Sequence, residues 1–154
     1  MKRSGIGRLI VISGLAIVAY AVLYAVLRPL LPGQLARHAG PDGAGYGPLW
    51  LAALVIGAVA AISLLIGIVA YRDFYSLGHW YPGPKAIVVC FLAAGFGILS
   101  LGASMLVTVM GRQAQEAGSL PVGMGLRGLV VAFGLSAPVL AWSLPGAKQE
   151  TLGP

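Results

Sequence analysis

Four long apolar stretches occupy most of this chain, and they constrain its fold more than any other feature. They run over residues 9–27, 49–70, 86–110 and 122–144 of a 154-residue sequence. About 20 apolar residues, rising 1.5 Å each in a helix, span a hydrocarbon core of roughly 30 Å. We therefore predict an all-α integral membrane protein with four transmembrane helices, organised as a single membrane domain over residues 1–154.

The composition agrees with a membrane protein. Apolar residues make up 58% of the chain and charged residues 9%, whereas soluble domains carry about 25% charged residues. The net charge of +6 comes from Lys and Arg at helix ends and connections, where they set orientation and contact lipid headgroups. No basic and aromatic stripe forms a nucleic-acid groove, so we expect no nucleic-acid partner.

The distribution of Lys and Arg predicts the orientation in the membrane. One side carries Lys2, Arg3, Arg8, Arg72, Lys85 and Lys148, and the other carries Arg28, Arg37, Arg112 and Arg127. The positive-inside rule then places both termini in the cytoplasm, and we expect the bacterial cytoplasmic membrane. The first stretch exceeds the 7–15 apolar residues typical of a signal peptide, so it is interpreted as a retained helix.

Arg127 is the one basic residue close to hydrocarbon in the fourth stretch. At the start of the helix it can extend toward the headgroups. The alternative is a buried cation that contacts an acidic group of another chain or of a lipid.

Two connections differ in character. Residues 28–48 are rich in proline and glycine, which favour turns over a helix; we expect an irregular loop, lying either on its own helix ends or under a partner. Residues 71–85 are aromatic. There Arg72, Phe74, Tyr75, Trp80 and Tyr81 form either an interfacial belt or a contact surface for a partner or lipid, because such residues concentrate binding energy.

Small residues recur at helical spacing along the last three stretches. In lipid, helices associate through close backbone approach, which small side chains permit. We expect them mainly to pack the helices of this chain, and the alternative is docking on other chains or on a flat cofactor or lipid. The predicted packing residues are Gly57, Gly97, Ser100, Ser104, Gly128 and Ala132.

Side chains arranged for catalysis, proton transfer or cofactor binding are missing from the apolar stretches. No carboxylate is placed there for proton-coupled transport, and His38 and His79 lie in connections, away from any mid-membrane haem or chlorophyll site. Cys90 alone makes no disulfide or metal cage, and no GxSxG, HExxH or P-loop motif occurs. The acidic residues lie outside these stretches and are Asp42, Asp73, Glu116 and Glu150. We therefore expect no enzyme, no catalytic residue, no metal and no cofactor.

These patterns favour a non-catalytic accessory subunit of a larger membrane complex, of a respiratory or photosynthetic electron-transport kind, with other membrane subunits and membrane lipids as partners. The alternative is a small homo-oligomeric channel or transporter, lined by Ser100, Ser104 and Thr108 with Arg127 at its mouth. A weaker third hypothesis is a lipid-modifying enzyme with His79 and Asp73 as acid and base.

Overall fold

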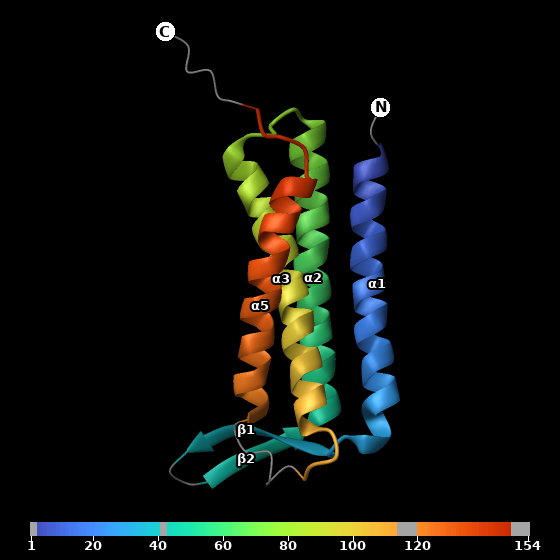
Figure 1. Ribbon diagram of the computed structural model, residues 1–154, viewed down its shortest axis with the longest axis vertical. Helices are drawn as coiled ribbons and strands as arrows, with labels where there is room; N and C mark the ends of the chain where they lie inside the picture. The colour runs from blue at the N-terminus through green and yellow to red at the C-terminus, as the bar shows by residue number, and fades with distance from the viewer. Residues whose placement is uncertain (1–2, 41–42, 114–119, 149–154) are drawn as a thin grey trace.

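The computed structural model describes residues 3–40, 43–113 and 120–148. In this part of the chain, α1 (Arg3–Leu27), α2 (Leu49–Ser76), α3 (Pro82–Val109) and α5 (Leu120–Ser143) are each long and apolar enough to cross a membrane. The start of α1 and the end of α5 lie at the same end of the bundle (Figure 1). The protein is an all-α integral membrane protein with four spanning helices, as the sequence predicts.

Proline and glycine determine where the helices begin and end. α2 starts directly after Pro48. Pro82 lies in the first turn of α3, where proline is tolerated because backbone N–H groups in the first turn make no hydrogen bond within the helix. Gly78 and Gly111 adopt φ angles of 77° and 70°, which let the chain turn after α2 and α3. α2 continues to Ser76 and α3 begins at Pro82, so most of the predicted aromatic connection, residues 71–85, is helical.

The first connection corrects the prediction of an irregular loop. After the 3₁₀ turn η1 (Arg28–Leu30), strands β1 (Gln34–Gly40) and β2 (Gly43–Pro48) pair antiparallel, with a register irregularity between Ala36 and His38. Glycine and proline disfavour strands locally, which is why residue preferences did not indicate them. Pairing of the two segments supplies the backbone hydrogen bonds that neither would have alone.

The hairpin lies across the end of the bundle opposite the termini (Figure 1). The backbone N–H of Gly111 donates to the carbonyl of Leu30 at 2.8 Å, and that of Leu49 donates to Gly33 at 3.2 Å. Leu35 is buried beside Leu49. Within the described residues the segment therefore lies on the helix ends of its own chain.

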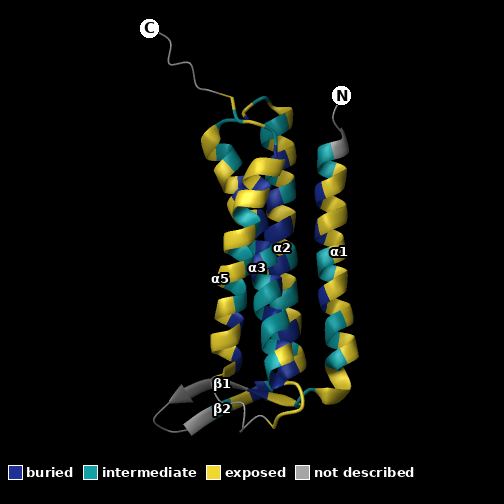
Figure 2. Ribbon diagram, viewed as in Figure 1, coloured by how far each residue is buried: buried dark blue, intermediate teal, exposed yellow. Residues whose placement is uncertain are grey.

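α3 is the central helix, packed against α2 on one side and α5 on the other, and the buried residues concentrate along α2 and α3 (Figure 2). The α2–α3 contact is reciprocal. A Cβ atom at Gly67 would lie 2.8 Å from Leu92 Cγ, and one at Gly95 would lie 2.5 Å from Leu64 Cγ. Each leucine thus fills the space over a glycine of the other helix, which brings the two backbones close.

Small residues also hold α5 against α3. An added Cβ at Gly128 would clash with Ser104 and lie 2.9 Å from the backbone oxygen of Ser100, and one at Gly97 would lie 3.2 Å from the backbone oxygen of Leu129. No room for a larger side chain exists at these contacts.

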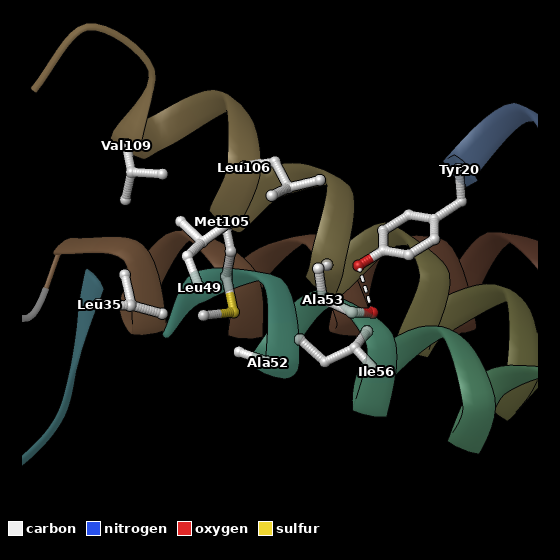
Figure 3. Close-up of a pocket in the computed structure, with 10 residues that line it drawn as sticks. Tyr20, Leu35, Leu49, Ala52, Ala53, Ile56, Met105, Leu106 and Val109 are labelled. Atoms are coloured by element: carbon white, nitrogen blue, oxygen red, sulfur yellow. Dashed lines mark hydrogen bonds between the residues drawn. The ribbon is translucent and has the colours of Figure 1, made fainter. Parts of the chain in front are cut away.

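α1 is attached to the bundle through Tyr20. Its ring lies over Gly57 and Gly102, where added Cβ atoms would approach it to 3.3 and 2.7 Å. Its hydroxyl donates to the carbonyl of Ala53 on α2 at 3.1 Å (Figure 3). The adjoining cavity toward the hairpin measures only about 10 Å³, space for one water molecule at most.

The α3–α5 contact gives a direct test of this packing. Gly128→Leu should lower the free energy of unfolding by about 1–3 kcal/mol, because the side chain would overfill the space occupied by Ser104. Gly134→Leu, on the same helix, is the matched control because no atom lies within 4 Å of its added Cβ. Thermal melting of both variants in lipid nanodiscs measures the difference, and equal melting temperatures would contradict the packing.

Candidate functional site

Three aromatic rings form a cluster at the end of the bundle that carries the termini. The Trp80 ring meets Tyr71 edge-on at a centroid distance of 5.2 Å and an interplanar angle of 84°, and meets Tyr75 at 6.0 Å and 70°. Such edge-to-face pairs are a favoured aromatic geometry. Tyr71 and Trp80 are only 4% and 2% exposed, so the cluster is an internal packing element.

The segment after α5 is tied to this cluster by three hydrogen bonds. The indole N–H of Trp80 donates to the carbonyl of Pro145 at 3.0 Å, and the backbone N–H of Lys148 donates to the carbonyl of Trp80 at 2.8 Å. The Lys148 ammonium donates to the carbonyl of Gly78 at 3.1 Å. The α2–α3 connection and the C-terminal segment therefore form one ordered layer, which we name the terminal platform (residues 77–81 and 144–148).

The platform changes the roles predicted for the aromatic residues. Trp80, predicted either to belong to an interfacial belt or to contact a partner or lipid, is covered by its own chain. Phe74, Tyr75 and Tyr81 are partly buried, and the first two pack against the core. Arg72 is exposed on the last turns of α2. α2 extends past residue 70, so Tyr71 and Tyr75 turn toward the bundle on a helical face.

Two residues outside the predicted set are the prominent apolar groups at this end. Leu77 is 68% exposed and Trp142 is 89% exposed. Trp142 lies in the last turns of α5, which end at the platform (Figure 1). The sequence alone gives no means of ranking Trp142 above Trp80, because both lie near the ends of apolar stretches.

The predicted packing residues lie at helix contacts in most cases. Gly57 faces Tyr20, Gly97 and Gly128 lie between α3 and α5, and Ala132 is half-buried on α5. Ser104 lies against Gly128 at the same contact, and Thr108 donates its hydroxyl to the Ser104 carbonyl of its own helix at 2.7 Å. Ser100 is among the residues that line a recess between α1 and α3.

Arg127 lies near the second turn of α5 and is exposed. It is therefore not buried within its own chain. Both Asp73 and His79 are also exposed. Among the described residues, no group of three or more His, Cys, Asp or Glu side chains is placed to hold a metal ion.

A large cavity separates the first half of α1 from the last half of α5. Its volume is about 710 Å³. Phe96 of α3, Tyr71 of α2 and Arg8 of α1 are among its lining residues. A further apolar recess of about 310 Å³ continues from Phe96 along α1 and α3.

Neither a protein-family model, nor a curated protein, nor a solved structure matches this chain.

The indole hydrogen bond of the platform is directly testable. Trp80→Phe keeps an aromatic ring but removes the donor to Pro145, so we expect the free energy of unfolding to fall by about 1 kcal/mol. Trypsin should also cleave after Lys148 faster, because the segment is less firmly held. Trp142→Phe is the control, since Trp142 is 89% exposed; equal effects of the two changes would contradict the role of the platform.

Proposed function

We propose that this protein is a non-catalytic accessory subunit of a larger membrane complex, of respiratory or photosynthetic type, and that it docks through the terminal platform. The supporting observation is the hydrogen-bonded layer formed by Trp80, Pro145 and Lys148. A surface fixed in advance loses little conformational entropy when a partner binds.

The side chains beside the platform suit such a contact. Leu77 and Trp142 project large apolar surface at 68% and 89% exposure, and Arg72 adds a charged donor nearby on α2. Tryptophan and arginine are enriched among residues that dominate interface energies. Trp80 contributes indirectly by holding the layer in place.

The docking surface can be tested with an exposed pair of residues. Leu77→Ala combined with Trp142→Ala should leave insertion and melting temperature unchanged, because both side chains project outward. We expect retention in the native complex after mild detergent extraction to fall about tenfold or more, since loss of a few central contacts costs about 2 kcal/mol. Immunoblotting of the purified complex measures retention.

The matched control is Trp50→Ala with Leu54→Ala, at the opposite half of α2. These side chains are 56% and 62% exposed. Loss of retention in the control alone would move the docking surface to the hairpin end. Unchanged retention in both variants would remove the platform as a docking site.

We also propose that the platform end faces the cytoplasm of a bacterial cell. Arg8 lies near the start of α1, Arg72 near the end of α2, Lys85 in the first turn of α3 and Lys148 after α5. These helix ends lie at the platform end of the bundle (Figure 1), and the positive-inside rule assigns such a concentration to the cytoplasm.

Two glycines provide the topology test. Gly33 lies at the hairpin end and Gly83 near the platform, and neither has an atom within 4 Å of an added Cβ. In a Cys90→Ala background, which removes the single native cysteine, an impermeant maleimide should label Gly33→Cys on intact cells. Gly83→Cys should react only after permeabilisation. The reverse pattern would invert the orientation.

A further inference from the structure

The cavity between α1 and α5 reaches through most of one membrane leaflet. Along α5 its lining runs from Ser136 to the helix end at Ser143, a rise of about 10 Å, and continues into Leu144 and Pro145. Half of a hydrocarbon core of roughly 30 Å is about 15 Å. Its deepest lining residue on α3, Phe96, lies near the middle of that helix. The cavity therefore extends from the platform end to about the membrane midplane.

The size of the cavity restricts its occupant. A volume of about 710 Å³ falls within the range of about 300–1,000 Å³ typical of small-molecule sites. A transmembrane helix about 10 Å across and 30 Å long would need several times that space. The occupant is thus a slender molecule rather than a helix of another chain.

The lining is largely apolar at depth, although it includes Ser136, whose hydroxyl donates to the Phe133 carbonyl of its own helix at 3.3 Å, and it is more polar near the platform end. Leu9, Ile12, Val139 and Leu140 contribute aliphatic surface, and none of the described lining residues is acidic. The Tyr71 hydroxyl lies close to Gly5, because a Cβ added to Gly5 would be 3.1 Å from it, and Arg8 follows Gly5 by about one helical turn. The Arg8 guanidinium and the Tyr71 hydroxyl are therefore two hydrogen-bond donors near the start of α1, at the level where a lipid headgroup would be.

We infer that this cavity binds an anionic phospholipid, with one acyl chain between α1 and α5 and its phosphate at Arg8 and Tyr71. The acyl chain matches the largely apolar interior. The phosphate matches the Arg8 guanidinium, which forms charge-assisted hydrogen bonds with such oxygens. The assignment concerns the isolated chain and is independent of the proposed docking at the platform.

The test is lipid binding by the full-length purified chain in detergent. Phosphatidylglycerol and phosphatidylcholine are titrated separately and counted by native mass spectrometry. We expect phosphatidylglycerol to bind about tenfold more tightly, from its interaction with Arg8. Arg8→Gln should abolish that preference, while the control Arg127→Gln, an exposed arginine that does not line the cavity, should retain it.

A second pair of variants tests the position of the acyl chain. Val139→Trp would fill the cavity, whereas Val130→Trp lies on the same helix outside it; the two valines are 61% and 66% exposed. We expect Val139→Trp to weaken binding of both lipids at least tenfold and Val130→Trp to leave it unchanged. Equal binding by these two variants, or no preference for phosphatidylglycerol in the wild-type chain, would overturn the proposal. An unchanged melting temperature shows that each variant is folded.

Discussion

Close approach of helix backbones is the constraint on which this structure depends. In hydrocarbon, burying one more apolar side chain gains little, so helices associate through dispersion contacts and interhelical hydrogen bonds. The Gly67–Leu92 and Gly95–Leu64 pairs provide these contacts between α2 and α3. The Ser63 hydroxyl, which donates to the Phe91 carbonyl at 2.8 Å, adds a hydrogen bond across the same pair of helices. α3 thereby becomes the fixed element against which α5 and α1 are placed.

The attachment of α1 differs in kind. α5 meets α3 through small residues such as Gly97 and Gly128, whereas α1 is held by the large ring of Tyr20. The buried Ser13 hydroxyl on α1 has no hydrogen-bond partner among the described residues. α1 thus meets the bundle through large side chains, Tyr20 and, beside Gly5, Tyr71, and its first half borders the space that we assign to a lipid chain.

The two ends of the bundle are covered by different structures. At one end β1 and β2 lie on the helix ends, with Leu35 buried beside Leu49. At the other end the aromatic cluster and the segment after α5 form the terminal platform, held by Trp80 and Lys148. Both arrangements satisfy backbone groups that would otherwise be exposed near the membrane surface, where unpaired N–H and C=O groups are unfavourable. They leave the platform side chains fixed in place.

The sequence by itself determined the membrane-spanning helices, because each must satisfy its backbone hydrogen bonds internally and this requirement leaves a local apolar pattern. It also indicated Gly57, Gly97 and Gly128 as sites of close approach, though not that Gly57 would accommodate Tyr20. Tertiary structure alone decided the hairpin pairing and the exposure of the tryptophans. Trp80 and Trp142 lie toward the same membrane end, yet they are 2% and 89% exposed. The Pro145 carbonyl, 65 positions away in the chain, accepts the Trp80 hydrogen bond, and contacts between such distant residues leave no local pattern.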